Sequence, residues 1–89
     1  MLDKVAETLG EYPDVVVSVE AHTDNQGAAA GNLELSKQRA LSVARYLVSK
    51  GVSGAQLKPQ AFGESRPRTS NATAAGRAQN RRVEINIVE

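Results

Sequence analysis

The sequence predicts a small α+β domain, a two-layer sandwich with helices on one face of a mixed β-sheet. Two segments, 2–9 and 32–50, carry apolar residues at the spacing of amphipathic helices. Two others, 14–21 and 81–88, alternate apolar side chains with others, as strands buried on one face do. The length of 89 residues fits one unit, so we assign residues 1–89 to a single domain.

The first expected elements are a helix and a strand joined by a turn. Apolar side chains of residues 2–9 share one helical face, and Gly10 is placed to end the helix. Residues 12–14 have turn composition. The segment 14–21, DVVVSVEA, then places its odd-numbered apolar residues on one face of a strand.

A polar loop at 22–31 leads to a second helix over about 32–50. We expect Asn32 to be the N-cap of this helix, because its side chain can accept a hydrogen bond from a free backbone N–H of the first turn. Ser53 is placed to cap a short helical turn before a strand around 58–62.

The remaining chain predicts a loop at 63–75, a brief helical turn at 74–79 and a last strand at 81–88. The expected order is therefore helix, strand, helix, strand, strand. A strand–helix–strand unit normally begins with a strand, so the opening helix makes this set incomplete.

Composition excludes several functions. Two Tyr, one Phe and no Trp are too few aromatic residues for a base-stacking platform, so we expect no nucleic-acid partner. The absence of cysteine excludes disulfides and thiolate zinc sites. Every apolar run is well short of the roughly 18 residues that indicate a membrane span. We expect no cofactor, no metal and no membrane span within this chain.

Catalytic signals are also weak. His22 is the single histidine, and no serine lies in a nucleophile-elbow pattern that would complete a catalytic triad. The loop glycines Gly27 and Gly31 match neither phosphate-binding glycine motif. We therefore expect a protein that is not an enzyme, with His22 as a structural residue at a strand end, hydrogen-bonded to the loop.

One group of residues suggests a binding site. Asp24 follows a strand end, Asn32 opens the next helix, and Arg39 lies seven residues further along the same helical face. The Arg39 side chain should lean back toward the loop that carries Asp24. A carboxylate, a guanidinium and free backbone N–H groups together suit a zwitterionic amino acid head group. Spacing alone leaves open, and favours, an internal Asp24–Arg39 salt bridge that only fixes the loop.

The charges of the chain are segregated although the net charge is +1. Residues 1–34 hold seven acidic residues against one lysine. Residues 58–82 hold one acidic residue against six basic ones, which are Lys58, Arg66, Arg68, Arg77, Arg81 and Arg82. This basic segment fits a solvated surface, and binding of a polyanion is an open alternative.

Residues 19–52, VEAHTDNQGAAAGNLELSKQRALSVARYLVSKGV, resemble the signature of the OmpA-like domain family. That family includes the C-terminal domains of OmpA porins, peptidoglycan-associated lipoproteins and MotB stator proteins. The resemblance continues through AFGESRP (61–67) and GRAQNRRVEINI (76–87), and so covers nearly the whole chain. It implies the βαβαββ fold of the family with the first strand missing.

The resemblance also implies a function. Family members bind peptidoglycan noncovalently through the diaminopimelate of the stem peptide, and so anchor a parent protein or the outer membrane in the Gram-negative periplasm. Asp24 matches the aspartate of the HTD motif and is implied to take the diaminopimelate ammonium. Arg39 matches the arginine of the LSxxRA motif and is implied to take the carboxylate. Asn32 is an implied pocket contact, and Arg81 of the NRR motif an implied second cationic wall.

Four further residues, Thr23, Asn25, Leu35 and Arg82, are implied to line or support this site. Because Arg82 alternates with Val83, it should face away from the core. A solvent-exposed charge on the strand therefore remains an open alternative for Arg82.

The sequence departs from the family in two places. Ala21 stands where the family usually has glycine, and a positive φ there would add strain of about 1 kcal/mol. The missing first strand would leave an unprotected sheet edge or an exposed groove. That edge supports the alternative to cell-wall binding, a protein interaction module or a homodimer.

Overall fold

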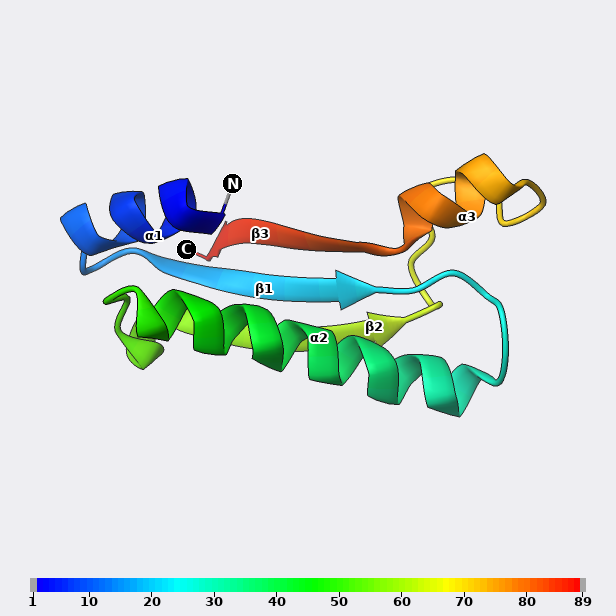
Figure 1. Ribbon diagram of the computed structural model, residues 1–89, viewed down its shortest axis with the longest axis horizontal. Coiled ribbons are helices and arrows are strands. Elements are labelled where there is room, and N and C mark those ends of the chain that lie inside the picture. Colours follow the sequence, from blue (N-terminus) through cyan, green and yellow to red (C-terminus); the bar gives the residue numbers. More distant parts are fainter. Residues whose placement is uncertain (1, 89) are drawn as a thin grey trace.

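The computed structural model describes residues 2–88 (Figure 1). The elements in order are α1 (Leu2–Glu11), β1 (Val16–His22), α2 (Ala29–Ser49), the 3-10 turn η1 (Gly54–Gln56), β2 (Leu57–Gly63), α3 (Ala74–Asn80) and β3 (Arg82–Val88). The three strands form one sheet with β1 in the centre, parallel to β2 and antiparallel to β3. The predicted α+β class and mixed sheet are confirmed.

The helices α1 and α2 pack against the same face of the sheet. Val17 and Val19 point to this face from β1 and belong to one buried apolar cluster with Leu9 of α1 and Leu47 of α2. Burying a Val or Leu side chain contributes roughly 1.5–3 kcal/mol, so this aliphatic cluster holds the two layers together. The short helix α3 lies beyond the end of the sheet, next to the start of β3 (Figure 1).

The turn η1 connects this core to the α1–β1 junction. The Ser53 side chain caps η1 as predicted, within a capping box completed by Gln56. Gln56 is buried, and its Nε2 lies 3.0–3.1 Å from the carbonyl oxygens of Leu9, Tyr12 and Val15. One amide therefore satisfies backbone acceptors where α1 ends and β1 begins.

The helix α2 begins three residues earlier than predicted, at Ala29. Its N-cap is Ala28, which has no side-chain capping bond. The prediction that Asn32 is the N-cap is therefore wrong. Alanine has the highest helix propensity, so the run of alanines before Gly31 extends the helix into the loop. Asn32 is consequently buried in the first turn, where its side chain turns toward the end of β1.

Ala21 lies inside β1, fully buried and paired with Ala61 of β2 and Val83 of β3. Within residues 2–88, positive φ occurs only at glycines. The strain considered for alanine at this position therefore does not arise.

The outer edge of β3 pairs with no other strand of the described chain. A groove of about 420 Å³ lies beside this edge, between α1 and the strands. Its walls are mostly apolar and include Val5, Leu9, Val17 and Ile85. Ile87 stands at the groove with 74% of its surface exposed.

Candidate functional site

Asp24 is fixed just past the carboxyl end of β1 by several hydrogen bonds. The Thr23 backbone N–H donates to the Gly63 carbonyl over 2.8 Å, which extends the β1–β2 contact by one residue. The Asp24 carbonyl accepts from Thr23 Oγ1 at 2.8 Å and from Asn32 Nδ2 at 3.3 Å. The carboxylate oxygen Oδ1 accepts from the Gln26 backbone N–H at 3.1 Å. Both the backbone and the side chain of Asp24 are therefore held in one orientation.

The ion-pair partner of Asp24 is Arg81, which directly precedes β3. Arg81 Nη1 lies 2.5 Å from Asp24 Oδ2. The Asp24 side chain is only 8% exposed, whereas the Arg81 side chain is 46% exposed. The Gln26 N–H and the Arg81 guanidinium hold the pKa of the Asp24 carboxyl below its ordinary value. Asp24 is therefore ionised near neutral pH and lies beneath an accessible guanidinium.

Arg39 does not form the internal salt bridge with Asp24 that spacing favoured, because Arg81 takes that position. Arg39 is half-buried on α2, seven residues after Asn32 and so on the same side of the helix. Across residues 2–88, no hydrogen bond or ion pair engages its guanidinium. Among the described residues, the Asp24 carboxylate is therefore paired with one guanidinium, that of Arg81, whereas the guanidinium of Arg39 on the next helix has no partner.

Three of the remaining predicted site residues adjoin Asp24. Thr23 and Asn32 contact Asp24, as described above, and Asn25 is exposed in the loop directly after it. Leu35 is an exposed apolar residue one helical turn before Arg39.

Arg82 is not brought to the Asp24 carboxylate. Its Nε lies 2.6 Å from Glu84 Oε2, and its other guanidinium nitrogens donate to the Asn80 and Arg66 carbonyls. Its side chain is only 15% exposed, so it is not the free strand charge that the sequence left open. Arg82 lies opposite His22 in the β1–β3 register and supports the end of the sheet.

Two buried polar residues outside the predicted site hold its frame, and Ser36 is the first. Its Oγ accepts from the Gly63 backbone N–H at 2.9 Å and donates to the Leu33 carbonyl at 2.8 Å, which ties the end of β2 to α2. Gly63 has a φ of 54°, and a Cβ there would lie 3.0 Å from the Leu33 Cα. This close approach requires glycine.

Asn80 is the second framing residue and is completely buried at the end of α3. Its Oδ1 accepts from the backbone N–H groups of Arg68 and Thr69 at 2.7 and 3.0 Å. Its Nδ2 donates to the Thr69 carbonyl and to Asn71 Oδ1 at 2.9 and 2.8 Å. The loop before α3 is thereby fixed against the residue that immediately precedes Arg81. Asn80 is the first residue of the NRR motif, but the resemblance implied a role in the site only for the two arginines of this motif.

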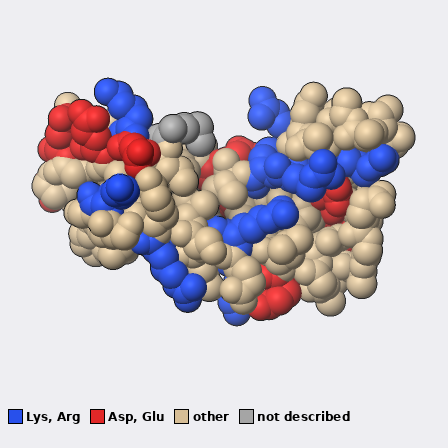
Figure 2. Space-filling model, viewed as in Figure 1, with Lys and Arg blue, Asp and Glu red and all other residues tan. Residues whose placement is uncertain are grey.

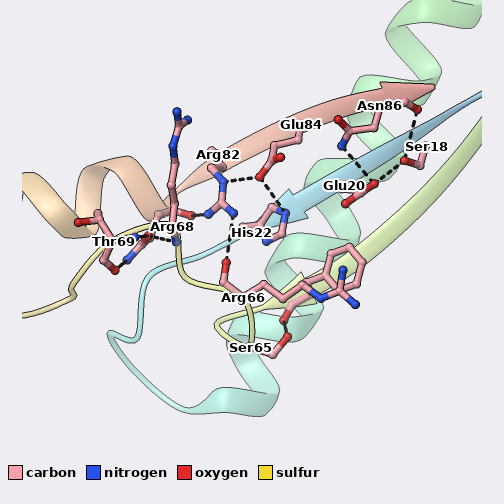
Figure 3. Close-up of polar contacts among 12 residues, drawn as sticks. Ser18, Glu20, His22, Ser65, Arg66, Arg68, Thr69, Arg82, Glu84 and Asn86 are labelled. Carbon is pink, nitrogen blue, oxygen red and sulfur yellow. Dashed lines mark hydrogen bonds and ion pairs between the residues drawn. The ribbon is translucent and has the colours of Figure 1, made fainter. Parts of the chain in front are cut away.

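The face of the sheet that is not covered by α1 and α2 carries a separate polar cluster around His22 (Figure 3). The His22 ring stacks on Phe62 with 5.2 Å between ring centroids, and Arg66 lies 4.0 Å from the Phe62 centroid. The expected hydrogen bond from His22 to the loop is wrong, because neither ring nitrogen makes a hydrogen bond among the described residues. The dashed line from His22 in Figure 3 marks a longer contact of 3.6 Å between Nε2 and Glu84 Oε2 on β3. Burial, followed by the charge of Arg82, lowers the pKa of His22, so the ring is neutral at pH 7. Its role is structural.

The charge segregation of the sequence persists in space. Figure 2 shows acidic side chains at the α1 end of the molecule and a band of basic side chains beside α3. Four of the six basic side chains of the segment 58–82 are engaged internally, since Arg81 and Arg82 pair with carboxylates, Arg77 donates to the Asn71 carbonyl and Arg66 lies over the Phe62 ring. The geometry therefore gives little support to the polyanion alternative.

Two other features, a metal site and a membrane-spanning helix, are not found among the described residues. Residues 2–88 contain no group of three or more His, Asp or Glu side chains placed to bind a metal. None of the helices in the described chain is both long and apolar enough to cross a membrane.

The fold and the site thus define a small α+β domain that presents a fixed carboxylate paired with the Arg81 guanidinium, with a further guanidinium, Arg39, on α2. Residues 1–81 match the OmpA family, and the chain belongs to that family. Membership confirms the resemblance seen in the sequence and the expectation that the domain is not an enzyme.

Curated relatives and solved structures agree with this assignment. The chain is 46% identical over 86 residues to the "Probable lipoprotein YiaD" of Escherichia coli K12, covering 97% of this chain and 39% of that protein. It is 47% identical over 85 residues to the peptidoglycan-binding protein ArfA of Mycobacterium bovis, covering 96% and 26%. The chain thus spans between about a quarter and two fifths of these relatives.

Two solved structures share the fold. The peptidoglycan-associated lipoprotein from Burkholderia pseudomallei superposes with a TM-score of 0.94 at 31% identity, covering 98% of this chain and 74% of that one. The C-terminal domain of Helicobacter pylori MotB gives a TM-score of 0.91 at 28% identity, covering 99% and 69%.

Proposed function

We propose that this domain binds peptidoglycan noncovalently through the diaminopimelate of the stem peptide, and so anchors its parent protein to the cell wall. The observation that carries the proposal is the fixed Asp24 carboxylate beside Arg81, together with an Arg39 guanidinium that no described residue engages, on the same side of α2 as Asn32. The names of two relatives, a peptidoglycan-binding protein and a peptidoglycan-associated lipoprotein, support the cell wall as the partner.

The residues take complementary roles in this proposal. The diaminopimelate side chain ends in an ammonium and a carboxylate on one carbon. Asp24 accepts the ammonium, and Arg39 donates to the carboxylate through its planar fork. Thr23 and Asn32 orient Asp24 through its carbonyl, and the exposed Leu35 contacts the methylene chain of the ligand. Asn25 borders the proposed site from the loop, and Arg81 adds positive charge beside the ligand carboxylate.

The proposed location is the cell envelope, in the periplasm for a Gram-negative parent protein. The relatives named as a lipoprotein and a peptidoglycan-associated lipoprotein support this location. A small, well-hydrated head group gives modest affinity for one stem peptide. The repeating polymer raises the overall affinity when several domains bind together.

Cosedimentation with purified diaminopimelate-type sacculi tests the proposal. Wild type should pellet with the sacculi, whereas Asp24→Ala and Arg39→Ala should remain largely in the supernatant. Arg45→Ala is the matched control, because Arg45 is exposed on a different side of α2 and lines a separate groove with Leu41 and Val48. The proposal fails if wild type stays soluble, or if both site variants pellet as wild type does.

The unpaired β3 edge supports a second candidate, a homodimer in which β3 pairs antiparallel with β3 of another copy. The exposed Ile87 and the adjoining apolar groove favour this arrangement. Sedimentation velocity over a wide concentration range distinguishes the two, since a concentration-dependent dimer without sacculus binding would favour the interaction module.

A further inference from the structure

We propose that Arg81 is an internal stand-in for the ammonium group of the ligand, and that this makes the site select a zwitterionic head group over a plain amine. The inference rests on the proposed function, because it concerns how the same site chooses its ligand. It starts from the ion pair between the Asp24 carboxylate and the Arg81 guanidinium.

The Asp24 carboxylate has little room for an additional cation. Its Oδ1 is held by the Gln26 N–H and its Oδ2 by Arg81, and only 8% of the side chain is exposed. An incoming ammonium at this buried carboxylate therefore competes with the Arg81 guanidinium for Oδ2. Binding is an exchange of cations at one carboxylate rather than an addition to an open site.

The Arg81 side chain is able to make this exchange. Its single hydrogen bond within the described chain is the one to Asp24, and 46% of its surface is exposed. Its backbone is anchored, since the Arg81 N–H donates to the Arg77 carbonyl and Asn80 is fixed just before it. Neighbouring Arg82 differs, because three acceptors hold its guanidinium. The Arg81 side chain can therefore rotate away from Asp24 while the backbone at residues 80–81 stays fixed.

The exchange has a different outcome for the two kinds of ligand. A plain amine pairs with Asp24 but leaves Arg81 without a partner, so the number of ion pairs does not rise. A zwitterion brings its own carboxylate, which can accept from the displaced Arg81 and from the unengaged Arg39. The number of ion pairs in the site therefore rises when a zwitterion binds. A diaminopimelate side chain carries this carboxylate and a lysine side chain lacks it, so the pair should discriminate between these two stem peptides.

Calorimetric titration with two tripeptide stems, one containing meso-diaminopimelate and one containing lysine at the same position, tests the inference. Wild type should prefer the diaminopimelate peptide by about tenfold or more, the effect of one additional charge-assisted contact. In Arg81→Gln the diaminopimelate affinity should fall while the lysine affinity holds or rises, so the ratio should shrink at least about threefold. Arg68→Gln removes an exposed arginine outside the site and should leave the ratio unchanged.

The outcomes separate the two proposals. An unchanged ratio in a folded Arg81→Gln variant, with both affinities falling equally, overturns the stand-in role and leaves peptidoglycan binding intact. Failure of wild type to bind either peptide overturns both. A measurement on wild type avoids any folding defect: the Arg81 side-chain Nε–H resonance should move on adding the diaminopimelate peptide. If that resonance stays in place at saturation, Arg81 remains on Asp24 and the inference is wrong.

Discussion

Replacing Asn80 with alanine should destabilise the domain more than any other single polar change near the site. Asn80 is completely buried and its amide makes four hydrogen bonds to the loop before α3. Alanine removes all four and leaves the N–H groups of Arg68 and Thr69 and the Thr69 carbonyl without these partners. Because this loop adjoins the residue before Arg81, the same variant should also loosen the site.

The magnitude follows from the number of bonds. A typical hydrogen bond contributes roughly 0.5–1.5 kcal/mol net, so the loss of four predicts a decrease of about 2–6 kcal/mol in the free energy of unfolding. For a domain of this size, 1 kcal/mol corresponds to roughly 4–8 °C in Tm. The variant should therefore melt at least about 8 °C below wild type.

Urea unfolding followed by circular dichroism measures this difference, with Asn71→Ala as the matched control. Asn71 accepts only one of the four bonds through its side chain, and its backbone carbonyl still accepts from Arg77. Its replacement should cost about 1 kcal/mol. If Asn80→Ala costs no more than Asn71→Ala, the central role assigned to the Asn80 amide is refuted.

Three further predictions concern the core and the pH dependence of stability. Gly76→Ala would place a Cβ 1.9 Å from the Ser70 carbonyl oxygen, so it should destabilise by about 1–3 kcal/mol in urea unfolding, and a neutral result would contradict this close approach. Leu47→Ala removes a fully buried side chain and should cost about 2–5 kcal/mol, with a smaller loss showing that α2 repacks. Burial lowers the pKa of His22 from 6.5, so the unfolded chain binds its proton at higher pH than the folded one. The contribution of the neutral His22 ring to the free energy of unfolding should therefore be fully present above about pH 6.5 and should be lost as the pH drops through the folded pKa. His22→Phe should remove this slope between about pH 7.5 and 5.5, and equal slopes in the variant and wild type would refute the assignment.

The order of elements could be predicted because local patterns determine it. Helical spacing, strand alternation and the Ser53 cap act over a few residues, and each expected element is found within a few residues of its predicted bounds. The N-cap of α2 was misplaced because Asn32 satisfies the composition rule for a cap. The preceding alanines, which have no capping ability, nevertheless extend the helix.

The ion-pair partner of Asp24 could not be predicted from helical spacing. Arg81 is 57 residues away in sequence and reaches Asp24 only because β3 pairs antiparallel with β1, which places the start of one strand beside the end of the other. Arg39 was favoured because it is close in sequence. Similarly, the stacking of His22 on Phe62 depends on the β1–β2 pairing and leaves no local signal.

Chemical-shift mapping with a meso-diaminopimelate stem peptide tests the central claim most directly. The account predicts that backbone amide shifts at saturation centre on Asp24 and its neighbours in the 23–26 loop, the first turns of α2 through Arg39, and Arg81. Shifts centred instead on the groove between α1 and β3, or the absence of shifts at saturating peptide, would contradict the account.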